Sequence, residues 1–316
     1  MTAVSLTVAC PVCDGRDYEP RFRPTGAGTE LGVDAQSFRP SADRFGEASG
    51  LVVRCRNCGH QFVEQPPPPD GVRDAYADAI DEVSLREEAG QVETARRALT
   101  RIETSVAPGL VCDLGCWTGS FLVAARERGW RTAGVEPSHW AASRAGDRGL
   151  GVRQGELHDH GLDAGSCRLV VMTDVLEHLT DPGDAVDEAR ALLEPDGLLW
   201  ITVPDAGSLL ARALGRRWWS VLPMHLQYFT GASMERLLTR HGFRVVWAGT
   251  HAKVFTARYY AERLGGYHPA LERLAVGAVT KTGLAARLVA PDFHDRLAVL
   301  ARRAAHVGPA GGSNVH

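Results

Sequence analysis

The stretch Asp113-Leu114-Gly115-Cys116-Trp117-Thr118-Gly119 decides the fold that we predict for this chain of 316 residues. It ends an apolar run that begins at Leu110 and has the pattern of a buried strand, and residues 121–128 after it have the pattern of a helix. Gly115 and Gly119 allow the backbone to turn sharply and to approach a ligand closely. This order predicts the first unit of an α/β fold, with a candidate binding loop at the turn.

The next predicted strand, residues 132–136, supports a nucleoside site. It ends in Glu136, which stands 17 residues after Gly119. A carboxylate at this strand end can accept hydrogen bonds from both ribose hydroxyls of an adenosine. Dinucleotide dehydrogenases and methyltransferases share this spacing, but Leu122 stands where the former carry a third glycine. An NAD-dependent oxidoreductase is therefore the less favoured interpretation.

Strand and helix patterns alternate along the rest of the chain. We expect strands at residues 169–173, 198–203, 243–248 and 296–301, and helices at residues 141–148, 185–193 and 232–241. Such alternation predicts an α/β fold with a mainly parallel, Rossmann-like sheet and helices on both of its faces. We expect this domain to span residues 109–303, with a helical insertion at 253–290 and a flexible tail at 304–316.

Residues 1–65 are predicted to form a separate, zinc-ribbon-like module. They contain two C-x-x-C pairs, Cys10/Cys13 and Cys55/Cys58. Two such pairs can offer four thiolates to one tetrahedral zinc ion, in a closed site without a direct catalytic role. Four reduced thiols in an apolar core are the alternative. Residues 66–108 are expected to be a proline-rich linker followed by a helix over 72–103.

The composition excludes some classes of function. The chain is 44% hydrophobic and 23% charged and has a net charge of −3, so no global attraction to nucleic acid or to an anionic membrane is expected. The sequence contains no apolar run of 18 residues and no basic segment before an apolar N-terminal core. We expect a cytoplasmic protein.

Several segments together resemble class I S-adenosylmethionine (SAM)-dependent methyltransferases. The glycine stretch is similar to their motif I, residues 174–182 (DVLEHLTDP) are similar to the segment after their fourth strand, and residues 193–199 are similar to the turn before their fifth. Trp117 departs from the pattern, because the family usually has glycine there, and Arg168 stands where an acid is common. The resemblance covers about residues 109–250 and implies SAM as cofactor.

The resemblance also implies which residues contact SAM. Gly155-Glu156-Leu157 is expected to line the adenine. The whole implied set is Asp113, Gly115, Cys116, Trp117, Gly119, Glu136, Pro137, Glu156, Leu157, Thr173, Asp174 and His178.

Methyl transfer needs mainly an acceptor placed in line with the sulfonium, and a hydroxyl or carbon acceptor needs a base as well. His178 and His225 are the candidate bases, because histidine is suited to this role near neutral pH. His225 lies in the aromatic segment 218–230, which we expect to cover the substrate. Hydrogen bonding to backbone for His178, and loop packing for His225, are the structural alternatives.

The Cys₄ module, helical linker and methyltransferase core together resemble deoxysugar C-methyltransferases of antibiotic pathways, which act on nucleotide-linked sugars. The matching loop of that family carries a Glu-His pair, which here is Met224-His225, and Tyr76 matches a tyrosine that the family presents to its active site. That family continues into a large C-terminal domain, which we expect this chain to lack. The resemblance implies a small-molecule acceptor, nucleotide-linked or carrier-linked, in secondary metabolism.

Two further functions are compatible with parts of the sequence. An rRNA or tRNA methyltransferase would also carry a zinc ribbon, but residues 1–65 contain seven Lys/Arg and eight Asp/Glu, which is not basic enough for RNA docking. The second of these functions is that of a protein that binds SAM without methylating, and the departure at Trp117 favours it.

Residues 253–303 contain nine Lys/Arg and four Asp/Glu. This basic excess is either a solvated helical face or a region that attracts an anionic group of the substrate.

Overall fold

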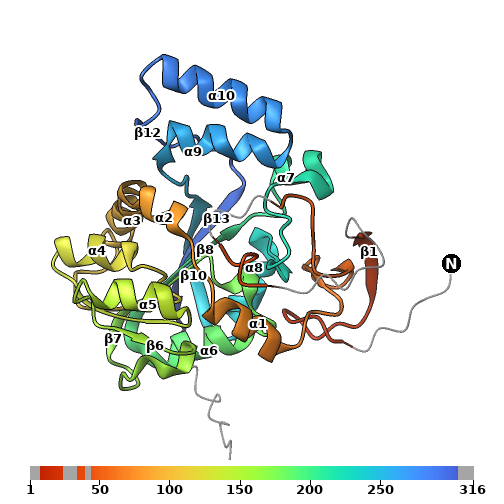
Figure 1. Cartoon of the computed structure of the whole chain (residues 1–316). Helices are drawn as coiled ribbons and strands as arrows, with labels where there is room; N and C mark the ends of the chain where they lie inside the picture. Colours follow the sequence, from red (N-terminus) through yellow and green to blue (C-terminus); the bar gives the residue numbers. More distant parts are fainter. Residues whose placement is uncertain (1–7, 24–33, 40–43, 305–316) are drawn as a thin grey trace, which may run out of the picture.

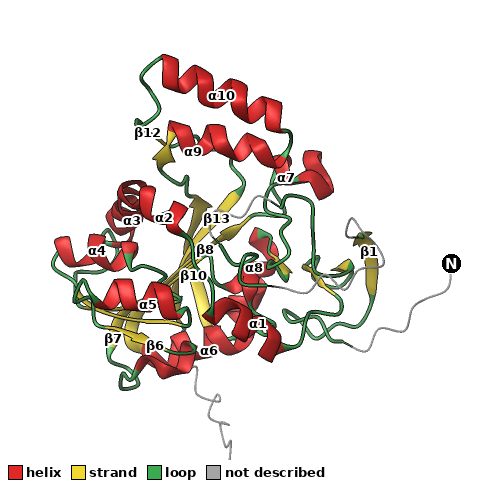
Figure 2. Ribbon diagram, viewed as in Figure 1, coloured by secondary structure: helices red, strands yellow, loops and turns green. Residues whose placement is uncertain are grey.

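A seven-stranded sheet forms the centre of the molecule, and six of its strands are parallel (Figures 1 and 2). The coordinates are a computed structural model that describes residues 8–23, 34–39 and 44–304. The tail that we predict at 304–316 lies outside the described residues, except for residue 304. In spatial order the strands are β10 (Phe243–Thr250), β13 (Arg296–Arg303), β8 (Leu193–Pro204), β7 (Cys167–Thr173), β4 (Leu110–Leu114), β5 (Arg131–Glu136) and β6 (Val152–Gln154).

The reversed strand is β13, which pairs antiparallel with β8 on one side and with β10 on the other. The pairs β4–β5, β4–β7, β5–β6 and β7–β8 are all parallel. The prediction of a mostly parallel Rossmann-like sheet is therefore confirmed.

Both faces of the sheet are buried, because neighbouring residues of one strand belong to different apolar cores. In β7, Val170 and Met172 pack in a core with α6 (Pro182–Leu192) and α8 (Gly231–Arg240). Leu169 and Val171 point to the other face, where they pack with α3 (Glu88–Ile102) and α4 (Ser120–Glu127). Burial on both faces explains why these strands are continuous apolar runs. Helix α5 (His139–Gly146) follows β5.

The predicted helix over 72–103 is wrong as a single element. It is divided into α1 (Pro69–Ala77), α2 (Glu82–Arg86) and α3. Asp81 causes the break, because its Oδ1 accepts hydrogen bonds from the backbone N–H groups of Val83 at 2.9 Å and Ser84 at 3.2 Å and so begins a new helix. Helix α1 already begins within the proline run, since a proline fits the first turn of a helix.

One N-terminal cysteine pair precedes a small antiparallel sheet and the other lies within it, and the sheet also includes a strand from a distant part of the chain. Its order is β1 (Tyr18–Phe22), β2 (Val52–Cys55), β3 (Gln61–Val63) and β9 (Gln227–Tyr228). Strand β9 belongs to the aromatic segment 218–230, so residues near the N-terminus directly support that segment.

The segment 253–290 is only partly helical. It contains α9 (Ala257–Glu262), the 3-10 helix η4 (Arg263–Gly266) and α10 (Pro269–Lys281), and a two-stranded ribbon of β11 (Phe255–Thr256) and β12 (Leu288–Val289). Helices α9 and α10 lie against each other at the top of Figure 1. The remaining short helices are α7 (Leu209–Leu214), η1 (Leu157–His160), η2 (Leu176–His178) and η3 (Gly215–Arg217). Among the described helices, none is long and apolar enough to cross a membrane.

Candidate functional site

A cavity of about 420 Å³ lies at the carboxyl ends of β4, β7 and β8. Its size is typical of small-molecule sites. The chain leaves β4 toward β5 and β6 on one side, whereas β7 and β8 lie on the other, so the cavity stands at a topological switch point of the sheet. Ligands of open α/β sheets bind at this place.

The predicted glycine turn forms one wall of the cavity. Gly115 has φ +78°, and a Cβ there would lie 2.8 Å from Cγ2 of Val175, so a larger residue is excluded on two grounds. Gly119 has φ +83° and packs against Leu150 outside the cavity, where a Cβ would lie 2.5 Å from the leucine Cδ1. Both glycines therefore have the conformational role that the sequence predicts.

Trp117, the departure from the family pattern, also lines the cavity. It has a left-handed backbone with φ +49°, which is strained for a residue with a side chain. Its indole Nε1 donates to Oγ of Ser84 at 3.1 Å, and its ring packs beside Trp140 (5.6 Å) and Tyr76 (6.3 Å).

The implied cofactor residues fall into two groups. Those that line the cavity are Asp113, Gly115, Cys116, Trp117, Thr173, Asp174 and His178, and those that do not are Gly119, Glu136, Pro137, Glu156 and Leu157. Glu136 is completely buried, and its two oxygens accept from the backbone N–H groups of Trp117 (2.7 Å) and Ser138 (2.8 Å). Burial raises the pKa of Glu136 to about 7. Glu156 is exposed and Leu157 is half-buried at the start of η1.

Several buried polar atoms of the cavity wall lack a hydrogen-bond partner among the described residues. They belong to Asp113, Thr173, Glu177 and Arg296. Asp113 is 3% exposed, and burial, with a further contribution from the charge of Glu136, raises its pKa to about 8. Buried polar atoms are nearly always paired, so these atoms indicate a wall that awaits a polar ligand.

Asp174 follows β7 and lies between two cations. Its Oδ2 is 2.5 Å from Nζ of Lys253, and its Oδ1 pairs with the guanidinium of Arg296. Burial opposes ionisation, but the charges of Arg296 and Lys253 hold the pKa of Asp174 well below its usual range. We did not predict these two cations individually, although the basic excess in 253–303 was a signal.

The two predicted histidines lie together on another wall of the cavity. The ring centroids of His178 and His225 are 4.9 Å apart. Nδ1 of His178 is 3.2 Å from the carbonyl oxygen of Met224, and Nδ1 of His225 is 2.7 Å from that of Ser220. Burial lowers the pKa of His178 to about 4 and that of His225 to about 3, so both are neutral at pH 7.

Tyr76 also reaches the cavity, from α1. It is half-buried, and its ring packs edge-on against Phe38 at 5.1 Å. Burial, together with the negative charge of Glu136, raises its pKa well above the usual value, so its phenol is neutral. The structure thus brings Tyr76, His178 and His225 to one cavity. Glu177, which precedes His178 in the segment 174–182, is a further wall residue that the sequence alone does not single out.

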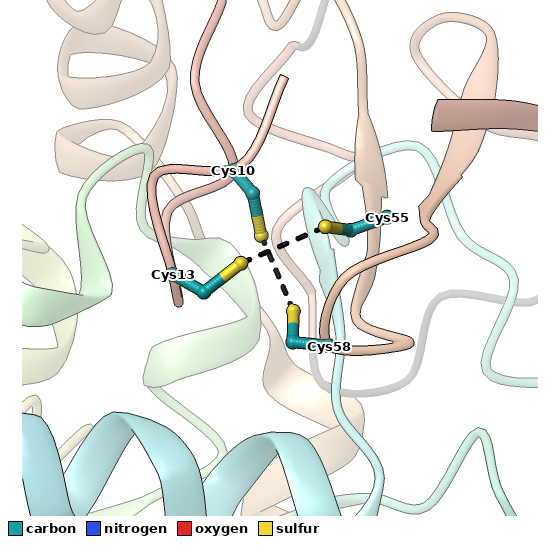
Figure 3. Close-up of side chains that lie close together, drawn as sticks. All are labelled: Cys10, Cys13, Cys55 and Cys58. Carbon is teal, nitrogen blue, oxygen red and sulfur yellow. Dashed lines mark hydrogen bonds between the residues drawn. The ribbon is translucent and has the colours of Figure 1, made fainter. Parts of the chain in front are cut away.

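The four N-terminal cysteines meet at one point (Figure 3). Sγ of Cys10 is 3.6 Å from that of Cys58, Sγ of Cys13 is 3.6 Å from that of Cys55, and all four lie within 4.8 Å of one another. A tetrahedral zinc ion with bonds of about 2.3 Å separates its sulfur ligands by about 3.8 Å. The arrangement therefore fits a Cys₄ zinc site.

Comparison with known proteins gives one family and a few relatives. A family model described as a methyltransferase domain matches residues 77–248, more than half of the chain. The C-methyltransferase NovU of Streptomyces niveus is 29% identical over 204 residues, which are 62% of this chain and 46% of that protein. The ubiquinone biosynthesis O-methyltransferase of Actinobacillus pleuropneumoniae is 29% identical over 103 residues, which are 29% of this chain and 44% of that protein.

Both relatives are matched over less than half of their length. Among solved structures, one chain of the complex that contains the Haloferax volcanii Trm112 methyltransferase activator is similar to 70% of this chain, and 92% of that chain is covered. Its TM-score is 0.50 at 17% identity, so this likeness concerns the fold alone.

Proposed function

The chain belongs to the methyltransferase-domain family, and from this premise we propose that it transfers a methyl group from SAM to a small-molecule acceptor. The cavity at the switch point of the sheet carries the proposal. Its glycine turn and its unpartnered polar wall, formed by Asp113 and Thr173, suit the cofactor. The histidine wall and the aromatic segment 218–230 suit the acceptor.

The cofactor brings the electrophilic methyl group already activated. The protein must hold the acceptor atom close to this methyl group, in line with the departing sulfur, and keep water out. Met224 and Trp219, both of which line the cavity, supply part of the apolar surroundings. We expect SAM to lie along the glycine turn, with its ribose toward Glu136.

A histidine takes the acceptor proton in this proposal. The Nδ1 atoms of His178 and His225 face carbonyl oxygens, which can only accept, so each Nδ1 carries the ring proton and each Nε2 has a free lone pair. We place His225 as the base because its segment covers the cavity, with His178 beside it. The neutral phenol of Tyr76 can donate a hydrogen bond to an acceptor oxygen.

The acceptor that we propose is a sugar or another intermediate of secondary metabolism, nucleotide-linked or carrier-linked. The likeness to NovU, whose name describes a C-methyltransferase, supports a carbon acceptor. Aromatic walls formed by Trp219, Tyr260 and Phe293 suit a ring, and Lys253 and Arg263 on the same cavity suit an anionic group.

The fit of the four cysteines leads us to propose a structural zinc ion in residues 1–65. It would be held by Cys10, Cys13, Cys55 and Cys58 and would keep β2 and β3 in place behind the aromatic segment.

Two measurements test the proposed function. Calorimetry with SAM should give binding, and a mass-shift screen with candidate sugars should give a product heavier by one methyl group together with S-adenosylhomocysteine. Absence of binding at millimolar SAM would refute the proposal. Binding without any product across the screen would favour the second candidate, a SAM-binding protein that does not methylate, for which the bulk of Trp117 in the turn is the supporting observation.

A further inference from the structure

Three side chains that lie close together on the wall of the cavity where we place the methyl acceptor have the composition of a metal site. They are Glu177, His178 and His225, and one potential ligand atom of each lies within 4.8 Å of those of the other two. Glu177 and His178 are neighbours in η2, after β7, whereas His225 comes from the segment before β9. All three line the cavity. They are separate from the four cysteines.

The orientation of both imidazoles suits coordination. The carbonyl oxygens of Met224 and Ser220 accept from the Nδ1–H groups of His178 and His225. A histidine that binds a metal typically donates its other ring N–H to such a group, which fixes the tautomer and the ring orientation. The Nε2 lone pairs of His178 and His225 are thus left available for coordination.

The carboxyl group of Glu177 is buried without a full set of hydrogen-bond partners. Glu177 is 1% exposed, and its Oε2 has no hydrogen-bond partner among the described residues. Burial of an unpaired carboxylate is unfavourable, and a bound cation would compensate for it.

We propose that Glu177 and the Nε2 atoms of His178 and His225 bind one divalent transition-metal ion. Two imidazoles and one carboxylate are a ligand set for Zn²⁺, Fe²⁺ and related ions, and they leave coordination positions open toward the cavity. Nearby, Lys253, Asp174 and Arg296 together carry one net positive charge. This charge favours an exchangeable ion over a permanently held one.

The metal ion would inhibit methyl transfer, a consequence that rests on the proposed function. The lone pair of His225 Nε2 cannot both coordinate a metal and accept a proton from the acceptor. The ion and the acceptor would therefore compete for this wall, while SAM, which we place along the glycine turn, would still bind.

The test is a titration of the 316-residue chain, first loaded with one equivalent of zinc, with Co²⁺. The expected result is one Co²⁺ per chain in addition to the Cys₄ metal, with weak d–d absorption and without the intense charge-transfer absorption that thiolate ligands give. Glu177→Gln and His225→Gln should each lose this second ion, and His251→Gln, which changes another histidine of the same cavity, should retain it. Circular dichroism of each variant shows that it is folded.

A wild-type protein that takes up no second ion, or folded Glu177→Gln and His225→Gln variants that both retain it, would overturn the metal site and leave the proposed methyl transfer intact. Product formation separates the two proposals further. Inhibition by Co²⁺ that gel filtration reverses is expected. If the second ion binds and turnover rises instead, the metal site stands and His225 is excluded as the base.

Discussion

The carboxylate of Glu136 accepts a hydrogen bond from the backbone N–H of Trp117, with 2.7 Å between Oε2 and the nitrogen, although the two residues are 19 positions apart. This bond connects the end of β5 to the glycine turn after β4. The other oxygen accepts from the backbone N–H of Ser138 at 2.8 Å. Each carboxylate oxygen has a further lone pair, but Glu136 is completely buried and does not line the cavity, so its observed role is to hold the turn against the end of β5.

We predict that Glu136→Gln weakens SAM binding by about tenfold or more and lowers the thermal stability of the protein. The amide places an N–H₂ donor opposite one of the two backbone donors, which loses a buried hydrogen bond of about 1–3 kcal/mol. Calorimetry and thermal unfolding measure the two effects. Glu235→Gln, a change at an exposed acid of α8, is the control that should alter neither. Wild-type SAM affinity in Glu136→Gln would contradict our placement of the ribose of SAM toward Glu136.

A second prediction concerns the left-handed backbone of Trp117. Trp117→Gly and Trp117→Ala both remove the ring and its bond to Ser84, but only glycine adopts φ +49° without strain. The glycine variant should therefore be about 1 kcal/mol more stable than the alanine variant. Chemical denaturation of both measures this difference. If the alanine variant were the more stable, the turn would not retain its conformation without the indole.

The third prediction follows from the raised pKa of Asp113. Its pKa is about 8 in the folded protein and near 3.8 when unfolded, so between these values the folded state binds the extra proton. Stability therefore decreases as the pH rises from about 4 to 8. Asp113→Asn removes this dependence, so the ligand-free variant should match the wild type near pH 4 and exceed it at pH 8, by about 2 °C or more in Tm.

The same Asp113→Asn variant should bind SAM more weakly, because Asp113 lines the cavity on the side where we place the cofactor. Tm measured across pH, and calorimetry at pH 8, check the two parts separately. If Asp113→Asn were less stable than the wild type at pH 8, favourable interactions of the Asp113 carboxylate in the native protein would outweigh the cost of burying its charge.

The sequence was a good guide where a local pattern determines the backbone. The positive φ of Gly115 requires glycine, and the apolar runs of β4 and β7 reflect burial on both sides. The sequence pattern did not reveal the break between α1 and α2, because capping by Asp81 starts a new helix within the helical pattern. A single acidic residue between helical segments is a weak indication that one helix ends and another begins.

Long-range pairing could not be predicted in the same way. The apolar run of β13 is compatible with either strand direction, and its insertion between β8 and β10 is determined only in the folded sheet. This insertion brings Arg296 opposite Pro204 at the carboxyl end of β8, and so to Asp174. Glu177 and His225 likewise meet only through tertiary structure, 48 residues apart in the chain.

The fourth prediction tests His225 as the base. His225→Gln should reduce turnover by about a hundredfold or more, since general-base catalysis contributes on this scale, and should leave SAM affinity unchanged. His241→Gln, at a histidine that pairs with Asp187 outside the cavity, should behave as the wild type. Initial rates of S-adenosylhomocysteine release give the comparison. Full activity of His225→Gln would exclude it as base and leave His178 as the candidate.

The final prediction connects the cysteine site to turnover. The N–H of Val63, at the end of β3, donates to the carbonyl oxygen of Leu226 at 2.9 Å, and Nε2 of His60 is 2.9 Å from Oε1 of Gln227. The N-terminal module therefore supports the segment that carries His225, whereas the proposed zinc site, closed by four thiolates, would have no direct contact with the substrate. Cys10→Ser should lose the metal and loosen this support.

We expect Cys10→Ser to contain about one zinc ion fewer per chain by elemental analysis and to turn over about tenfold more slowly or worse, because a misplaced acceptor wall is costly in rate. SAM affinity should change little, since the glycine turn and Asp113 lie elsewhere. Cys167→Ser, at a buried thiol of β7, is the control that keeps the zinc. Unaltered zinc content would refute the Cys₄ site, and zinc loss with full turnover would show that the module does not position His225.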